Sequence, residues 1–442
     1  MTSEPCRLAD VGSVGPSRAP RRAKFGFLFN HDQIHQIAHS LPIAVELARL
    51  VPSVDVVLTT TNERLREEVL HLAGCHLGGN LQFAHLEVNR PSTKLLCKAT
   101  GRVIPSTKLL IYRDNLDFFR SLDVLVVAEK TSVLLKTRYG LDRLKIIHTR
   151  HGAGDRAIGF NRISAAFDHV LVAGAKIQDR LVFSAGVEAN RISVVGYPKF
   201  DLFASSPASS PWPNNDRRPI VLYNPHVAPH LSSWYKMGRQ VLDWFLRHDE
   251  YRLIFAPHVM LFERPLAVSI DPPRLGIPGH VAARHMHAAN IHIDLGSRAS
   301  TTMAYTNVAD IYLGDVSSQV YEFLVRPRPC VFLDAHGFDW RNDPNFMHWT
   351  AGPVIRYVDE LGTSISVAQG KHELLYREGQ EALFRYTFNL EPVLSSVRAA
   401  RAIANVAGLG SSAAEQTHST DVGPSAVEEQ PEGTGRDREC AL

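Results

Sequence analysis

The sequence has little that would set it apart from an ordinary globular protein. Of its 442 residues, 45% are hydrophobic and 21% are charged, and the formal net charge is only +3. So small a net charge gives no indication of a basic surface that would bind nucleic acid. No apolar run reaches the roughly 18 residues that a membrane span needs. We therefore expect two or three globular domains and no nucleic-acid partner.

Cysteine is scarce as well, and its spacing has no pattern. No C-x-x-C pair occurs and the number is odd, the five being Cys6, Cys75, Cys97, Cys330 and Cys440. This usage is typical of a reducing compartment, with neither a disulfide framework nor a zinc ribbon. The N-terminus also lacks the apolar core of a secretory signal. We expect a cytoplasmic protein whose basic segment at residues 18–24 is a solvated arm or, as the alternative, a peripheral contact with the inner face of the cell membrane.

Several catalytic signatures are missing. The sequence has no GxxxxGK[ST] element, no G-x-S-x-G elbow and no HExxH pair. Three histidines, His31, His35 and His39, recur every four residues, but no carboxylate cluster accompanies them. We therefore expect neither a metal nor a cofactor, and place His31 in the loop after the first strand, near an acceptor substrate.

The chain divides into regions by composition. Both ends lack large apolar side chains and cannot bury enough surface to offset the entropy of ordering, so we expect them to be disordered. Between them, short apolar runs alternate with helical segments, a pattern typical of parallel sheets covered on both faces. A Pro- and Ser-rich stretch interrupts this alternation once. The predicted regions are a disordered arm (1–22), a Rossmann-like domain (23–203), a linker (204–218), a second Rossmann-like domain (219–375), a helical segment (376–408) and a disordered tail (409–442).

Two doubly wound α/β domains in tandem would face each other across a cleft. Ligands of open α/β sheets bind beyond the carboxyl ends of the strands. Functional side chains are therefore expected in the loops that follow strands. The predicted strands cover residues 25–29, 54–60, 122–128, 144–149, 169–174 and 191–196 in the first domain, and 219–225, 251–258, 290–294, 310–315 and 329–334 in the second.

The segment GDVSSQVYEF (314–323) joins a predicted strand to a predicted helix. Unpaired N–H groups at a helix start attract anions, so Asp315, Ser317 and Ser318 are candidates for binding a donor phosphate. Glu322 lies one turn further along the same face and is a candidate ligand for ribose hydroxyls. The alternative is an ordinary serine cap with a solvent-facing glutamate.

Two loop histidines follow strands. His151 lies in the loop after the strand at 144–149 and precedes Gly152, which frees the backbone there and is itself a candidate for the donor phosphate or nucleotide site. His258 ends the strand at 251–258. A histidine in such a place can act as a general base or donate to a phosphate; the alternative for both is a structural turn.

Three further residues are candidates for the acceptor site or the cleft. Lys199 and Asp201 lie in the turn YPKFD after the strand at 191–196, and His226 lies in the loop after the strand at 219–225. A turn that crosses between the domains and ends in a capping aspartate would explain the first two equally well.

The order of these elements resembles the CDP-glycerol glycerophosphotransferase family, the teichoic-acid polymerase-like enzymes of the GT-B superfamily. The resemblance covers roughly residues 145–335: a His-Gly loop, G-x-P-x-x-D, a strand ending in Pro-His, and A-D-x-x-x-x-D-x-S-S-x-x-x-E. It implies the GT-B fold, with the acceptor in the first domain and the nucleotide in the second.

The same resemblance implies roles for individual residues. His151 would be the catalytic base on the acceptor hydroxyl, and His258 would contact the donor phosphate. The D-x-S-S loop would hold the pyrophosphate, with Glu322 close to the nucleotide. The chain departs from the family pattern after Gly152, where Ala-Gly-Asp-Arg replaces Thr-Pro-Leu-Lys, and at Val259 and Lys199, where Pro and Arg are usual.

The expected function is transfer of a glycerophosphate or glycosyl group from a nucleotide-activated donor, CDP-glycerol-like, to a hydroxyl acceptor, lipid-linked or not, in cell-envelope polymer or glycolipid synthesis. The donor is a substrate, so no cofactor is expected. Two alternatives stay open: an enzyme like UDP-N-acetylglucosamine 2-epimerase, and a non-catalytic binding protein that has lost the activity. The sequence does not decide the oligomeric state.

Overall fold

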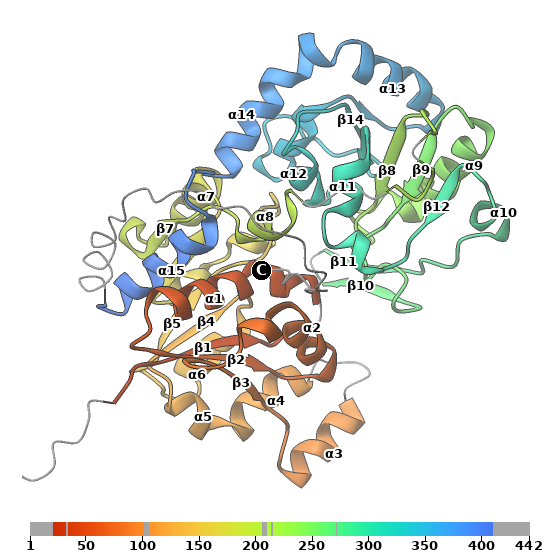
Figure 1. The fold of residues 1–442 in the computed structure, drawn as a ribbon. Coiled ribbons are helices and arrows are strands. Elements are labelled where there is room, and N and C mark those ends of the chain that lie inside the picture. The colour runs from red at the N-terminus through yellow and green to blue at the C-terminus, as the bar shows by residue number, and fades with distance from the viewer. Residues whose placement is uncertain are drawn as a thin grey trace, which may run out of the picture.

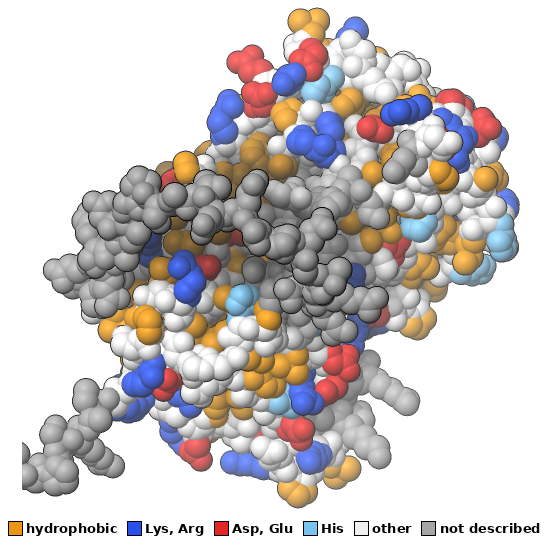
Figure 2. All heavy atoms as spheres, viewed as in Figure 1, with side chains coloured by type: hydrophobic (Ala, Val, Ile, Leu, Met, Phe, Trp, Pro, Cys, Tyr) orange, Lys and Arg blue, Asp and Glu red, His pale blue; other side chains and the backbone are white. Residues whose placement is uncertain are grey.

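The structure, a computed structural model, describes residues 21–31, 34–100, 106–205, 210–213, 215–270 and 272–409. These residues form two α/β domains, one above the other in Figure 1. On the face drawn in Figure 2, the basic and acidic side chains of the described residues are interspersed. The strands are buried on both faces, as in β4 (Val124–Val127), which is why they are continuous apolar runs.

The N-terminal domain is built on a parallel sheet. In the described part of the chain it has seven strands in the order β3-β2-β1-β4-β5-β6-β7. Its other strands are β1 (Lys24–Phe29), β2 (Asp55–Thr60), β3 (Leu81–His85), β5 (Lys145–His148), β6 (His169–Val172) and β7 (Ile192–Val194). Its helices are α1 (Leu41–Leu50), α2 (Glu63–Ala73), α3 (Pro91–Thr100), α4 (Ser106–Asp114), α5 (Leu116–Arg120), α6 (Leu134–Thr137), α7 (Ala175–Ala185) and α8 (Pro198–Phe203).

The C-terminal domain repeats this plan. Its described strands form a six-stranded parallel sheet in the order β12-β9-β8-β13-β14-β15, with an antiparallel hairpin β10-β11 inserted after β9. The strands are β8 (Ile220–Asn224), β9 (Arg252–Phe255), β10 (Ala267–Ile270), β11 (Pro273–Gly276), β12 (Ile291–Ile293), β13 (Ile311–Gly314), β14 (Cys330–Leu333) and β15 (Val354–Ile355). The helices are α9 (Arg239–Arg247), α10 (Ala283–Met286), α11 (Ala304–Val308), α12 (Gln319–Phe323), α13 (Leu361–Gly370) and α14 (Arg377–Thr387).

The chain then returns to the first domain. Helix α15 (Ser395–Val406) packs on α1 (Figure 1), and its buried alanines and Ile403 belong to the N-terminal core. Asp201, at the end of the first domain, accepts hydrogen bonds from the backbone N–H groups of Ser395 (3.3 Å) and Ser396 (2.7 Å) and so caps α15. The domains are therefore joined by two crossings of the chain.

Several details differ from the sequence predictions. Helix α1 was not predicted to start at Leu41; Pro42 lies in its first turn, which needs no N–H from proline. Strand β3 was not predicted, because it is an edge strand whose outer residues are polar. Cys75 is disulfide-bonded, so the expectation of a chain without disulfides is wrong at this position; sequence spacing does not report proximity in space.

The second crossing depends on a glycine. Gly196 has φ +87°, and a Cβ there would overlap with Ser395, Arg398 and Asn389 of the returning segment. We expect Gly196→Ala to lower the free energy of unfolding by more than the roughly 1–2 kcal/mol that left-handed backbone costs a residue with a Cβ. Chemical denaturation measures this loss.

Gly186→Ala is the matched control, because Gly186 has a similar φ of +67° but open space where a Cβ would lie. This variant has the free-energy cost of a left-handed backbone at a residue with a Cβ, but no overlap of that Cβ with neighbouring atoms. Equal losses for the two variants would contradict the close approach at Gly196.

Candidate active site

A cleft of about 400 Å³ lies between the two domains, at the carboxyl ends of both sheets. The strands β5 and β13 run toward it from opposite sides. It brings together eight of the predicted site residues: His151, Gly152, Lys199, His226, His258, Ser317, Ser318 and Glu322.

Three predicted residues do not line this cleft. His31 is buried at the end of β1, with its ring edge-on to Phe29. Asp201 caps α15 and lines a separate pocket. Asp315 is buried, and its carboxylate accepts from the backbone N–H groups of His226 and Ser233, so it holds loops in place and does not face a ligand.

His151 lies at a sharp turn after β5 and is exposed to the cleft. Arg150 and Gly152 flank it with φ of +58° and +71°. The Nδ1 of His151 lies 2.9 Å from the carbonyl oxygen of Ala128. A carbonyl can only accept, so Nδ1 carries the proton and Nε2 carries the lone pair. Desolvation, helped by the charge of Arg150, lowers the pKa of His151. The ring is therefore neutral at pH 7 and able to take a proton.

His226 and His258 have the opposite tautomer. The Nδ1 of His226 accepts from the backbone N–H of Ala228 at 2.9 Å, and that of His258 from Met260 at 3.3 Å. The proton of each ring is thus on Nε2. Desolvation lowers the pKa of His226 well below its usual value and that of His258 to about 4. Their ring centroids lie 5.8 Å apart, so the cleft has two neighbouring neutral N–H donors.

The two serines lie opposite the His151 loop. Ser317 Oγ donates to Asn224 Oδ1 at 2.5 Å. A Cβ on Gly154 would lie 3.1 Å from the Cβ of Ser318, and one on Gly152 would lie 3.6 Å from its Oγ. The glycines therefore allow the two loops to approach closely. Ser318 precedes α12 but makes no side-chain cap, so the cap alternative does not hold for it. Helix α12 has only five residues, fewer than predicted.

Lys199 and Glu322 pair across the domain boundary. Lys199 Nζ lies 2.7 Å from Glu322 Oε1, and both side chains are buried. Tyr197 also donates to this carboxylate, at 3.3 Å. Glu322, which was predicted to contact ribose, is therefore ion-paired with a lysine of the other domain.

Arg156 is a cation that the sequence patterns did not single out. Its side chain lines the cleft and makes no hydrogen bond or ion pair with another described residue. Desolvation lowers its pKa, and its charge in turn helps to lower the pKa of both His226 and His258. One signal was available, since Arg156 occupies the place of the lysine in the family's His-Gly-Thr-Pro-Leu-Lys loop.

The described lining of the cleft carries an excess of positive charge. Lys130 and Arg150 both donate to the carbonyl oxygen of Gly159. Desolvation lowers the pKa of Lys130 to about 8. The acidic residues of the lining, Asp155 and Glu322, each pair with a buried lysine. The arrangement favours an anionic ligand.

Within the described residues, no group of three or more His, Cys, Asp or Glu side chains is placed to hold a metal ion. None of the helices in that part of the chain combines the length and the apolar composition of a membrane span.

Comparisons with known proteins bear on the fold. No protein-family model matches the chain. No curated protein sequence matches it either. Among solved structures, a variant of the wall teichoic acid polymerase TagF superposes with a TM-score of 0.53 at 13% identity, covering 89% of this chain and 90% of that one. TagF has also been studied after soaking with CDPG.

Two further structures match over similar lengths. The glycosyltransferase of kitacinnamycin has a TM-score of 0.53 at 11% identity, with 88% of this chain and 100% of that one covered. A putative UDP-N-acetylglucosamine 2-epimerase from Listeria monocytogenes has a TM-score of 0.55 at 11% identity, with 91% and 99% covered.

The chain has the GT-B fold. The two parallel sheets of the described residues, with their helices, agree with these matches, so the predicted fold class is confirmed. The likeness to the CDP-glycerol glycerophosphotransferase family is confirmed at the level of this GT-B fold.

The cleft histidines make stability depend on pH. A group whose pKa is lower in the folded state binds fewer protons there, so stability falls as the pH drops below the unfolded value of about 6.5. For His258, with a folded pKa of about 4, the loss at pH 5 is at most about 2 kcal/mol. We expect His258→Gln to lose less unfolding free energy between pH 7 and pH 5 than the wild type does, as measured by denaturant titration at each pH.

His280→Gln is the control, since His280 is exposed outside the cleft. It should show the pH dependence of the wild type. If His258→Gln does so too, the ring of His258 is not held neutral by its surroundings.

Proposed function

We propose that the chain is a GT-B transferase that moves a glycerophosphate or glycosyl group from a nucleotide-activated donor, with CDP-glycerol as the first candidate, to a hydroxyl acceptor in cell-envelope polymer or glycolipid synthesis. One observation carries this proposal. The lining of one cleft combines an accepting Nε2, on His151, with two Nε2–H histidines, Ser318 and Arg156. A base facing a set of anion donors suits transfer from a nucleoside diphosphate.

The acceptor half of the reaction belongs to the first domain. The Nε2 of His151 takes the proton of the acceptor hydroxyl as the oxygen attacks the donor. If the donor is CDP-glycerol, the oxygen bonds to the phosphorus that bears glycerol, the phosphoanhydride bond breaks and CMP leaves. If the donor is a nucleotide sugar, the oxygen bonds to the anomeric carbon and the nucleoside diphosphate leaves. Either way, His151 later releases its proton to solvent.

The donor half belongs to the second domain. Negative charge grows on the leaving phosphate as its bond breaks. The Nε2–H groups of His226 and His258, the hydroxyl of Ser318 and the guanidinium of Arg156 would stabilise that charge. The hydroxyl of Ser317 already donates to Asn224 and shapes the turn instead. No cofactor enters this scheme.

The epimerase alternative is less well supported. Moving a proton on and off a sugar carbon calls for a base positioned at that carbon. The carboxylates in the described lining, Asp155 and Glu322, are both buried and ion-paired. The fold itself fits either activity, since a putative epimerase has it as well.

The direct test is turnover. The protein is incubated with CDP-glycerol or with UDP-sugars, and release of CMP or UDP is measured with and without polyol and glycolipid acceptors. We expect one donor to be consumed and to raise the melting temperature. The proposal fails if neither class of donor is consumed and neither changes the melting temperature.

His151→Ala tests the base. We expect kcat for transfer to fall by about 10²- to 10⁴-fold, the usual contribution of a positioned base. The donor KM should change little, because the donor contacts lie on the other wall. Steady-state kinetics measure both, and the melting temperature serves as the check on folding. Turnover at the wild-type rate would rule out His151 as the base.

Arg156→Gln tests the anion site. Removing this charge should weaken binding of a nucleoside diphosphate by at least about tenfold, because a charge-assisted contact contributes about 1.5–3 kcal/mol. Calorimetric titration measures the change. Arg162→Gln, which alters an exposed arginine outside the cleft, is the matched control. The assignment is wrong if both variants bind like the wild type.

A further inference from the structure

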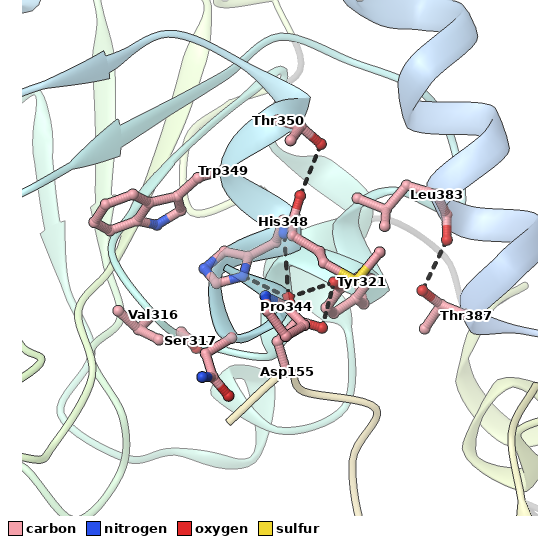
Figure 3. Close-up of polar contacts among 12 residues, drawn as sticks. Asp155, Val316, Ser317, Tyr321, Pro344, His348, Trp349, Thr350, Leu383 and Thr387 are labelled. Atoms are coloured by element: carbon pink, nitrogen blue, oxygen red, sulfur yellow. Dashed lines mark hydrogen bonds and ion pairs between the residues drawn. The ribbon is translucent and has the colours of Figure 1, made fainter. Parts of the chain in front are cut away.

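A buried carboxylate connects the two walls of the cleft. Asp155 follows His151 by four residues in the same loop of the N-terminal domain. Its side chain is fully buried and pairs with Lys176 of α7 at 2.7 Å. It also accepts from the hydroxyl of Tyr321, at 2.7 Å, and from Nδ1 and the backbone N–H of His348, at 2.8 and 3.1 Å. Figure 3 shows these C-terminal-domain groups converging on the carboxylate.

The contacts continue from His348 to the serine turn. The Nε2 of His348 lies 3.0 Å from the carbonyl oxygen of Asp315, which also accepts from the indole N–H of Trp349 at 2.8 Å. The carboxylate of Asp315 in turn accepts from the backbone N–H groups of Val316 (2.6 Å) and His226 (2.9 Å). A continuous series of hydrogen bonds thus joins the His151 loop to the backbone of the donor site.

The charges in this series fit together. Burial raises the pKa of Asp155, but Lys176 and the hydrogen bond from His348 outweigh burial and hold the pKa below its usual value. The ammonium of Lys176 also lies 3.5 Å from the centre of the Tyr321 ring. The carboxylate is therefore ionised, with the ammonium of Lys176 beside it.

We propose that Asp155 is a positioning residue, which fixes the His151 loop relative to the turn at residues 315–318 when the cleft is closed. The inference rests on the proposed function, because it concerns the distance between the base and the leaving group of that reaction. The contacts from Tyr321 and His348 come from the other domain, so they exist only with the two walls together, whereas Lys176 holds the carboxylate from within its own domain. A hydrophobic contact would hold the walls at similar cost, since buried polar pairs stabilise little over apolar replacements. The hydrogen bonds from Tyr321 and His348 add a defined direction.

Kinetics of Asp155→Asn test the proposal. The variant keeps the size of the side chain and removes its charge. We expect kcat, counted per molecule that binds nucleoside diphosphate, to fall by at least about tenfold, because a displacement of 1 Å between reacting groups costs about 100-fold. The affinity for nucleoside diphosphate in the absence of acceptor should change less than kcat. A purely structural role would lower the fraction of binding molecules and leave kcat per binding molecule unchanged.

Two further variants keep this test decisive if Asp155→Asn folds poorly. Asp155→Leu with Lys176→Met replaces the buried pair by apolar groups, which usually restores stability. We expect its melting temperature to recover and its kcat to stay low; recovery of both would overturn the proposal. Asp179→Asn is the matched control, because it removes the charge of a carboxylate that accepts a cross-domain hydrogen bond from Tyr386, at 2.7 Å, outside the cleft lining.

Hydrogen exchange separates this inference from the proposed function. We expect backbone N–H groups in residues 315–323 to exchange faster in Asp155→Asn than in the wild type, and not in Asp179→Asn. Unchanged exchange would overturn the positioning role, whether or not the protein is a transferase. A wild-type protein that neither binds nor consumes a nucleotide would instead overturn the proposed function.

Discussion

The chain crosses between the domains twice, and these two crossings determine how the two sheets are oriented toward each other. The first crossing leaves the N-terminal domain after α8, and the second returns through α14 to α15, which packs on α1. Gly196 and Asp201 lie where the two crossings meet. Gly196 allows the returning segment to approach closely, and Asp201 caps α15. Because both sheets are parallel, this arrangement brings carboxyl ends of strands from both sheets to a single cleft.

Within that cleft, hydrogen bonds to the backbone give neighbouring histidines different chemistry. A carbonyl at Nδ1 leaves His151 with an accepting Nε2, whereas backbone N–H groups at Nδ1 leave His226 and His258 with donating Nε2–H groups. Burial and the nearby cations keep all three rings neutral. The proposed division between base and phosphate donors thus follows from local backbone geometry, and the uncompensated charge of Arg156 adds the attraction for an anion.

The sequence predicted the fold and the main loops because alternating apolar runs and strand-end residues are local features. It placed His151, His258 and the two serines at or after the ends of strands, and all four line one cleft. It could not show that Glu322 is paired with Lys199, that Asp315 is turned inward, or that Asp201 caps a helix almost 200 residues later, since each depends on contacts between distant segments. Asp155 and His348 are 193 residues apart, and no sequence pattern indicates that their side chains are in contact.

The central claim is that the cleft binds a diphosphate between the two domains. The most direct measurement is a calorimetric titration of the wild-type protein with a nucleoside diphosphate and with the same nucleoside lacking phosphate, at low and at high salt. The account predicts binding that requires the phosphates and weakens as salt is added. Equal affinity for the nucleoside and the diphosphate, or no binding of either across the common bases, would contradict it.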